Sequence, residues 1–256
     1  VVMIDVADEF IVRGLAGIEK GLGRLVDKGR MEAADRDAAL ARITTSTDIA
    51  AGADADLFVE AAPESLDIKK GLFEKAAATL RSDAILASNT SSLPIADLAK
   101  FVTHPERFVG IHFFNPVPLM ALVEVVVGER TSDDTVAAAR AFAEGVGKTP
   151  ITVKDSPGFV VNRILFPMIN EAANALHEEV ATAEDIDTGM KLGANWPMGP
   201  LALADLVGLD TTTAILETLE RELGDSKYAP SPALARLRDA GKLGRKTGSG
   251  FYDYGT

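Results

Sequence analysis

The sequence predicts an α/β protein in which a doubly wound, mostly parallel sheet is followed by a domain made only of helices. Over residues 1–154, short apolar segments alternate with longer segments of helical periodicity. This pattern is typical of strands joined by crossover helices. From Asp155-Ser156-Pro157-Gly158 onward we find no convincing strand. We therefore expect a mixed domain over residues 1–154 and an all-helical domain over residues 155–256.

The elements of the first domain follow one another without an internal repeat or a low-complexity linker. Val1–Ile4 is predicted to be a buried strand that stops at the acid Asp5. The apolar steps of three and four between Ile11 and Leu25 predict a long amphipathic helix. The expected strands that follow lie at 43–46, 56–60, 84–88, 108–114, 122–127 and 151–153, and the expected helices lie at 35–42, 66–80 and 135–146.

The second domain is predicted from helical patterns alone. Residues 159–169 indicate one long helix, and Thr182-Ala183-Glu184-Asp185 resembles a capping box that opens the next. Two further helices are expected at 210–223 and 232–240.

Composition excludes several classes of function. The absence of cysteine removes thiol nucleophiles, thiolate metal sites and disulfides, and the three histidines are too scattered for a zinc motif. A net charge of −12 disfavours nucleic acid as a partner. No apolar stretch approaches the ~20 residues that cross a bilayer, and the first residues lack the features of a signal peptide. We therefore expect a cytoplasmic or organelle-matrix enzyme without a metal or a membrane partner.

The start of the chain departs from the usual dinucleotide-binding, or Rossmann-type, pattern. Such a domain opens with a strand and a G-x-G-x-x-G turn, and an acid about 20 residues later binds the ribose hydroxyls. Asp5 matches that acid, and its carboxylate favours NAD over NADP because it repels a 2′-phosphate. The glycine-rich segments at 14–23 and 244–250 lack the required strand-before, helix-after context. We therefore expect that roughly 25–30 residues, with the first strand and the glycine loop, are missing before Val1. The alternative is a chain that begins here with an ordinary edge strand.

His112 and Glu124 are the candidates for acid–base chemistry. His112 lies near the carboxyl end of a predicted strand, where open α/β sheets bind their ligands, although a single strand histidine is more often structural. Glu124 lies in the next predicted strand, and its apolar flanks make a solvated surface acid a poorer interpretation. A carboxylate that accepts one imidazole N–H fixes the tautomer and stabilises the imidazolium. The pair can therefore act as a general base and its orienting acid.

Four segments form an ordered set that is more specific than any one of them. They are Glu60-Ala61-Ala62-Pro63-Glu64, Ala87–Leu93, Gly110–Pro118 and Asp155–Arg163, and Trp196–Pro200 and Lys246–Tyr252 extend the set into the helical half. Together they resemble the 3-hydroxyacyl-CoA dehydrogenases of fatty-acid β-oxidation and butyrate metabolism, over the whole chain. The resemblance implies reversible, NAD-dependent oxidation of a (3S)-3-hydroxyacyl-CoA, with a short chain such as 3-hydroxybutyryl-CoA, to the 3-ketoacyl-CoA. It also implies a homodimer formed through the helical domain, which closes one side of the cleft.

The resemblance assigns roles to individual residues. His112 and Glu124 become the acid–base pair, and Ser91 and Asn162 hydrogen-bond the oxygen atoms of the substrate. Contacts to NAD are implied for Asp5, Glu64, Lys69, Ser91, Asn115 and Lys246, and a contact to the coenzyme A portion of the substrate for Lys28. The sequence departs from the family pattern at Gly21, where some relatives have a serine that touches the coenzyme.

Simpler interpretations exist for several of these residues. Ser91 can merely cap a helix that begins near Leu93. Glu64 and Lys69, taken alone, are a helix-start acid and a surface lysine, and Lys246 is a basic residue of a solvated loop.

Two alternative functions also stay open. One is an NAD-dependent dehydrogenase of a free hydroxy acid, of the carnitine or gulonate type, and Lys28 favours the thioester over it. The other is a non-catalytic NAD-binding relative, since fold alone does not establish activity. The intact set of Ser91, His112, Glu124 and Asn162 argues against this second alternative.

Overall fold

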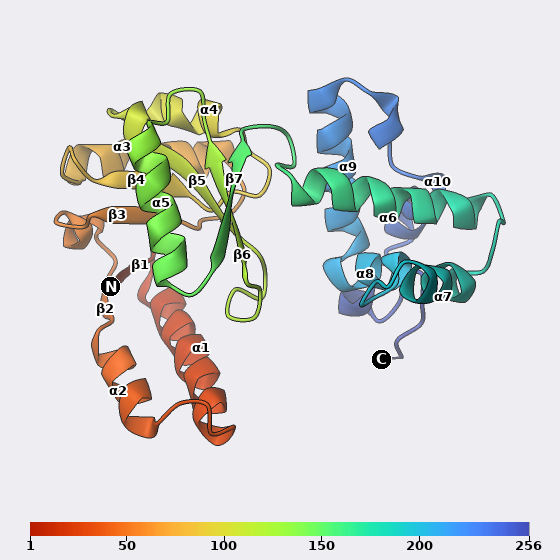
Figure 1. The fold of residues 1–256 in the computed structure, drawn as a ribbon, viewed down its shortest axis with the longest axis horizontal. Helices are drawn as coiled ribbons and strands as arrows, with labels where there is room; N and C mark the ends of the chain where they lie inside the picture. The colour runs from red at the N-terminus through yellow and green to blue at the C-terminus, as the bar shows by residue number, and fades with distance from the viewer. Residues whose placement is uncertain (256) are drawn as a thin grey trace.

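The computed structural model describes residues 1–255, which form two parts (Figure 1). Strands and crossover helices up to Lys154 make the first part, and helices from Val161 onward make the second. The predicted fold class, a mostly parallel α/β sheet followed by helices, is confirmed. No helix within residues 1–255 combines the length and the apolar character that a membrane span needs. Short 3₁₀ turns lie at Ile49–Gly52, Ala99–Phe101, Pro105–Arg107, Ser226–Tyr228 and Arg245–Thr247.

The main sheet runs in the order β3-β4-β5-β6-β7. Its strands are β3 (Leu57–Glu60), β4 (Ile85–Ser88), β5 (Phe108–Phe113), β6 (Leu122–Val127) and β7 (Thr149–Lys154). Neighbouring strands are parallel except for β5 and β6, which are antiparallel and place His112 directly opposite Glu124. The short connection between β5 and β6 explains this exception, because a parallel pair needs a long crossover.

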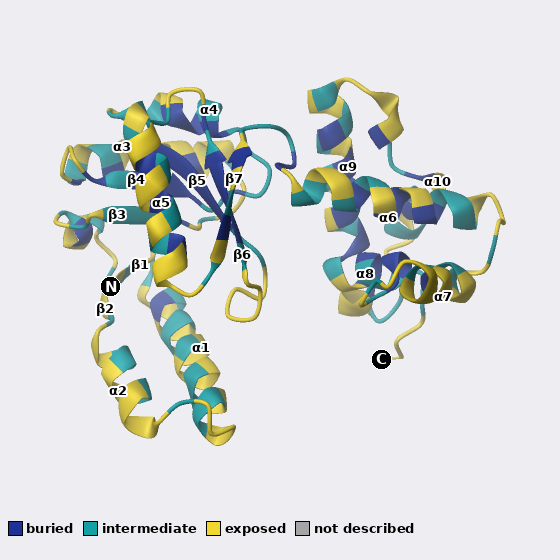
Figure 2. Cartoon of the chain, viewed as in Figure 1, coloured by how far each residue is buried: buried dark blue, intermediate teal, exposed yellow. Residues whose placement is uncertain are grey.

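Helices cover both faces of this sheet, which is why its strands are apolar on both sides. On one face α3 (Leu66–Thr79) and α4 (Ile95–Leu98) pack over Leu86 and Phe108. On the other face α5 (Asp133–Gly145) packs over Val109 and Ile111 through its alanines. The central strands are therefore buried, as Figure 2 shows by their dark blue colour.

The first strand is less buried than the sequence predicts. β1 (Val2–Ile4) pairs in parallel with β2 (Thr44–Ser46), and among the described residues neither strand joins the main sheet. Val1 and Val2 are exposed and Met3 and Ile4 are only half-buried, so the expectation of a buried strand over the first four residues is wrong in this structure. The reason is that one short partner strand and one helical hairpin cannot cover both faces of β1.

The hairpin consists of α1 (Asp8–Asp27) and α2 (Ala33–Ala41), and it projects from the sheet in Figure 1. The predicted amphipathic helix is confirmed in α1, but Ile11 alone of its described residues is fully buried. The rest of the apolar stripe is half-buried and faces α2. The far end of this hairpin is therefore a mostly exposed surface (Figure 2).

The second part packs around α6 (Val161–His177). Its other helices are α7 (Ala183–Gly193), α8 (Pro200–Val207), α9 (Leu209–Leu223) and α10 (Pro232–Asp239). The predicted cap is present, since the Thr182 hydroxyl accepts a hydrogen bond from the Asp185 amide at 3.2 Å. α8 was not predicted, because it is short and apolar on all sides, so it shows no 3.6-residue pattern.

At Gly110 the side chain of Ile95 in α4 packs so closely on the sheet that there is no room for a Cβ atom. A Cβ atom at Gly110 would lie 2.8 Å from Ile95 Cδ1 and 2.8 Å from Val126 Cβ. Gly110→Ala is therefore expected to lower the free energy of unfolding by about 1–3 kcal/mol, as overpacked cores do. Gly71→Ala is the control, because nothing lies within 4 Å of its Cβ position in α3. The control should be neutral or stabilising by up to about 1 kcal/mol. Equal stabilities of the two variants in urea unfolding would contradict this packing.

Candidate active site

The structure brings His112 and Glu124 together as cross-strand neighbours of β5 and β6. His112 Nδ1 lies 2.7 Å from Glu124 Oε2, and the two side chains are 7% and 0% exposed. A carboxylate can only accept here, so Nδ1 carries the proton and donates it. The imidazole is thereby held in one tautomer, with its lone pair on Nε2.

The second oxygen of Glu124 reaches the helical part. Glu124 Oε1 accepts hydrogen bonds from the backbone amides of Val160 and Val161, each at 3.0 Å. These amides belong to the first turn of α6, whose N-cap has no side-chain cap of its own. A helix N-terminus has unpaired N–H groups and a partial positive charge, and both favour a carboxylate. One buried acid therefore orients the histidine and caps the first helix of the second part.

The Nε2 side of His112 remains available. The ring packs against Phe114 and Phe159, with centroids 4.6 and 5.5 Å away. Among the described residues Nε2 has no hydrogen-bond partner, and it is not among the fully buried unpaired atoms. This atom can therefore exchange a proton with a bound molecule, as a general acid or base must.

Ser91 and Asn162 come together from different parts of the chain. Asn162, the second residue of α6, donates from Nδ2 to the Ser91 carbonyl oxygen at 3.4 Å. The loop that carries Ser91 is also tied to β5, because Asn89 Oδ1 accepts from the Phe113 amide at 2.9 Å. Ser91 thus lies close to the strand that carries His112.

The interpretation of Ser91 as a helix cap is wrong. α4 begins at Ile95, and the Leu93 amide donates to the Thr90 hydroxyl at 2.9 Å instead. Within residues 1–255 the Ser91 hydroxyl has no hydrogen-bond partner. It is therefore free to bind a ligand.

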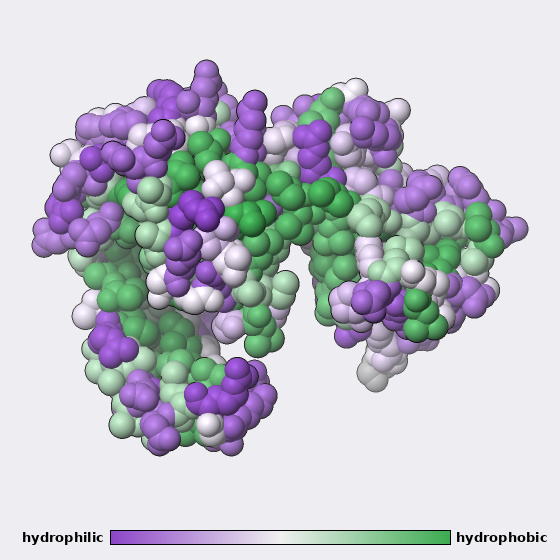
Figure 3. Space-filling model, viewed as in Figure 1, coloured by the Kyte–Doolittle hydropathy of each residue, from purple (hydrophilic) through white to green (hydrophobic). Residues whose placement is uncertain are grey.

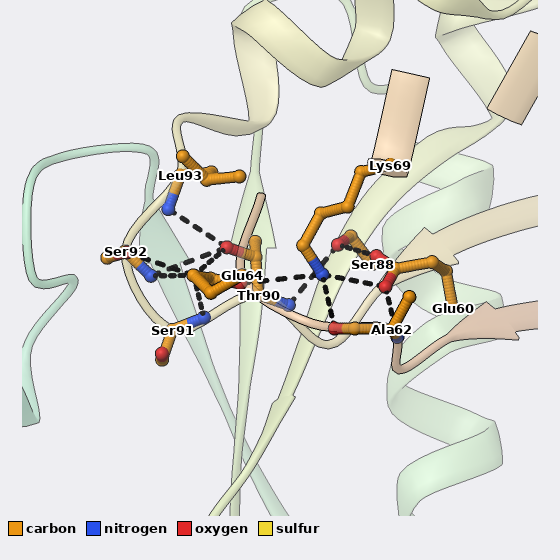
Figure 4. Close-up of polar contacts among 9 residues, drawn as sticks. All are labelled: Glu60, Ala62, Glu64, Lys69, Ser88, Thr90, Ser91, Ser92 and Leu93. Carbon is orange, nitrogen blue, oxygen red and sulfur yellow. Dashed lines mark hydrogen bonds and ion pairs between the residues drawn. The ribbon is translucent and has the colours of Figure 1, made fainter. Parts of the chain in front are cut away.

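Glu64 shapes the loop on which Ser91 lies (Figure 4). Its Oε1 accepts from the Thr90 hydroxyl at 2.6 Å, from the amides of Ser91 and Ser92 at 3.0 and 2.8 Å, and from the Ser92 hydroxyl at 2.9 Å. Partial burial alone would raise the pKa of Glu64. The hydrogen bond from Thr90, the charge of Lys69 and the bonds from Ser92 outweigh it and hold the pKa below the ordinary value of 4.5.

Lys69 is a buried residue, and the interpretation as a surface lysine is wrong. Its side chain is 1% exposed, and Nζ lies 2.6 Å from Glu60 Oε1, 3.2 Å from the Ala62 carbonyl and 3.4 Å from Glu64 Oε2. The Ser88 hydroxyl donates to the other oxygen of Glu60 at 2.6 Å (Figure 4). The roles of Glu60 and Ser88 were missed in the sequence, although the pairing of β3 with β4 sets them side by side.

The remaining predicted residues lie apart from the dyad. Asp5 follows β1, where its carboxylate accepts from the Val6 amide at 2.7 Å. Asn115 is exposed three residues after His112. Lys28 ends α1 at the far tip of the hairpin. Lys246 Nζ is paired with both oxygens of Asp210 in α9, at 2.5 and 2.6 Å. The structure therefore does not bring Lys246 to the loop that carries Ser91.

The polar groups of the first part fit a dinucleotide only in part. The exposed carboxylate of Asp5 can accept hydrogen bonds from ribose hydroxyls. Among the described residues the Ser91 hydroxyl and the Asn115 amide keep their hydrogen-bonding capacity. Lys69 does not fit as a direct contact, because its buried ammonium already donates to Glu60 and to the Ala62 carbonyl and is ion-paired with Glu64.

Two family profiles match the chain, one over each part. The family profile described as "3-hydroxyacyl-CoA dehydrogenase, NAD binding domain" matches residues 1–156. The profile described as "3-hydroxyacyl-CoA dehydrogenase, C-terminal domain" matches residues 158–254.

Individual proteins are similar over nearly the whole chain. A probable 3-hydroxybutyryl-CoA dehydrogenase of Deinococcus radiodurans is 52% identical over 254 residues, which cover 99% of this chain and 91% of that protein. The human mitochondrial hydroxyacyl-coenzyme A dehydrogenase is 42% identical over 261 residues, which cover 99% of this chain and 83% of that protein. The crystal structure of (S)-3-hydroxybutyryl-CoA dehydrogenase from Ralstonia eutropha superposes with a TM-score of 0.98 at 49% identity, covering 100% of this chain and 90% of that one.

The double role of Glu124 leads to a stability prediction. In Glu124→Gln one terminal atom becomes an NH₂ group, which cannot accept, so either the imidazole N–H or the α6 amides lose their acceptor. The free energy of unfolding is expected to fall by about 1–3 kcal/mol, the cost of an unsatisfied buried group. Glu129→Gln is the control, because Glu129 is exposed just after β6. Hydrogen exchange at Val160 and Val161 should accelerate in Glu124→Ala, which removes both acceptor oxygens, but not in the control, and unchanged exchange there would contradict the capping role.

Proposed function

This chain belongs to the 3-hydroxyacyl-CoA dehydrogenase family, and on that premise we propose that it catalyses the reversible, NAD-dependent oxidation of a (3S)-3-hydroxyacyl-CoA to the 3-ketoacyl-CoA. We propose a short acyl chain, as in 3-hydroxybutyryl-CoA, since relatives of that name are among the most similar. The observation that carries the proposal is the buried His112–Glu124 pair, which leaves His112 Nε2 without a protein partner among the described residues.

In this proposal His112 moves the proton. Its Nε2 takes the proton of the substrate hydroxyl, while Nδ1 continues to donate to Glu124. The imidazolium that forms is stabilised by the buried carboxylate 2.7 Å away. NAD, when bound, accepts the hydride from the same carbon. In the reverse direction the imidazolium returns its proton to the developing alkoxide.

Other residues hold the substrate and the cofactor in the proposal. The Ser91 hydroxyl and the Asn162 amide orient the substrate oxygen atoms. Such orientation can lower the activation barrier by several kcal/mol, about 7 in well-oriented cases. Asp5 and Asn115 contact the cofactor directly, while Glu64 and Lys69 act through the Ser91 loop. Lys28 is the proposed contact to coenzyme A. A cofactor contact from Lys246 requires that its ammonium, already paired with Asp210, reaches further.

We also propose that residues 1–154 form the dinucleotide-binding domain and residues 155–256 the substrate and dimerisation domain. The change from strands to helices between Lys154 and Val161 supports this division. Similarity to bacterial proteins and to mitochondrial hydroxyacyl-coenzyme A dehydrogenases supports a cytoplasmic or matrix location.

Removal of the proposed base tests the reaction. His112→Gln is expected to fold normally and to lose turnover by about 10²–10⁴-fold, the usual contribution of a general base. His104→Gln is the control, because that histidine is 43% exposed and pairs only with Glu106 at the surface. The assay follows NAD reduction with 3-hydroxybutyryl-CoA and, separately, with free 3-hydroxybutyrate. Near-normal turnover of His112→Gln would reject the assignment, and preference for the free acid would favour the hydroxy-acid alternative.

A homodimer through the helical part is the second testable part of the proposal. Ile164 and Met168 lie one turn apart on α6 and are 57% and 39% exposed, so together they offer an apolar strip that a second copy of the chain can cover. Sedimentation at micromolar concentration should give a dimer for the unmodified chain and a monomer for Ile164→Asp. Ile68→Asp, which changes an exposed apolar residue of α3, should remain dimeric. A monomeric unmodified chain would contradict the proposal.

A further inference from the structure

The loop that joins β5 to β6, residues 114–121, lies next to the site, and few of its side chains are buried. Residues 115–121 are all exposed, and the apolar side chains of Val117, Leu119 and Met120 are 42%, 79% and 42% exposed. The loop begins at Phe114, whose ring packs on His112. In Figure 1 the loop lies below β6, and Figure 3 shows apolar surface there beside a gap between the two parts. Its conformation therefore has to come from polar ties.

Lys148 supplies the strongest of these ties. Its Nζ donates to the Val117 carbonyl at 2.5 Å and to the Met120 carbonyl at 2.8 Å. Inside the loop, the amides of Leu119 and Met120 both donate to the Pro116 carbonyl, at 2.9 and 3.1 Å. Bonds from an ammonium are stronger than bonds between neutral groups. The Lys148 ammonium thus links two carbonyl groups on either side of the loop's tip.

Backbone hydrogen bonds on both sides of Lys148 fix its position next to the loop. Gly147, two residues beyond the end of α5, has the left-handed conformation, with φ of 76°, and its amide donates to the Glu144 carbonyl at 2.9 Å. The Lys148 amide donates to the Ala143 carbonyl at 2.9 Å, which completes a helix C-cap. The next residue, Thr149, donates its amide to the Ala121 carbonyl at 2.7 Å. Lys148 is therefore fixed between the end of α5 and the end of the loop.

We propose that Lys148 is a positioning residue that presets the 115–121 loop for cofactor binding, so that Asn115 is already in place when the dinucleotide arrives. This inference rests on the proposed function. A loop that is ordered before binding loses less conformational entropy on binding, so affinity rises without a new contact. The chemical step does not depend on the loop, because Glu124 and the strand pairing hold His112. Loss of Lys148 therefore weakens binding and leaves the proton transfer intact.

The test is Lys148→Met, which keeps the length of the side chain and removes the ammonium. The dissociation constant for NADH, measured by fluorescence titration without substrate, is expected to rise about tenfold. The KM for NAD should rise with it, and kcat should stay within about twofold. Lys148→Arg should restore most of the affinity, because a guanidinium can also donate to two carbonyls. Lys154→Met, at the exposed opposite end of β7, is the control and should bind as the unmodified chain does.

A second measurement needs neither cofactor nor activity. In the ligand-free protein, hydrogen exchange at the amides of Leu119 and Met120 should be several-fold faster in Lys148→Met. Exchange at the Phe113 amide, which bonds to Asn89, should stay the same. Unchanged exchange in the loop, or a fall in kcat with unchanged NADH binding, would overturn the inference. An unmodified chain that does not turn over 3-hydroxybutyryl-CoA would count against the proposed function, and the exchange measurement would still decide the role of Lys148.

Discussion

The carboxylate of Glu124 is fully buried, and a buried charge is tolerated only where donors surround it. Its donors come from both parts of the protein: the His112 imidazole on β5, and the amides of Val160 and Val161 at the start of α6. The orientation of the proposed base and the attachment of the helical part therefore depend on the same group. A change at this acid alters both together.

Around this centre the structure combines rigid strands with loops that polar contacts hold. His112 and Glu124 lie within paired strands, where their separation is set by the register of β5 and β6. Ser91 and Asn115 lie on loops, and these loops are held by Glu64 and Lys148 respectively. Strand positions give the acid–base pair a fixed geometry, and polar ties restrain the loops that carry Ser91 and Asn115.

The errors of sequence reasoning share one cause, which is that periodicity describes a single segment and not its neighbours. Lys69 has the spacing of a surface lysine, yet Glu60 on β3 and Glu64 before α3 make a buried site for it. Ser91 has the composition of a helix cap, yet the neighbouring Thr90 takes that role. Residues 1–4 have the apolarity of a buried strand, yet their surroundings leave them exposed or half-buried.

The sequence by itself determined the order of the strands and of most helices, the change to a helical part after Lys154, and the choice of His112 and Glu124 as partners. It could do so because local patterns and a short connection between adjacent strands contain that information. Only the tertiary structure decided that Glu124 also caps α6, that Lys69 is buried, and that Lys148 holds the loop beside His112. Each of these contacts joins residues from separate elements, with directions set by the packed backbone, and no single segment encodes that geometry.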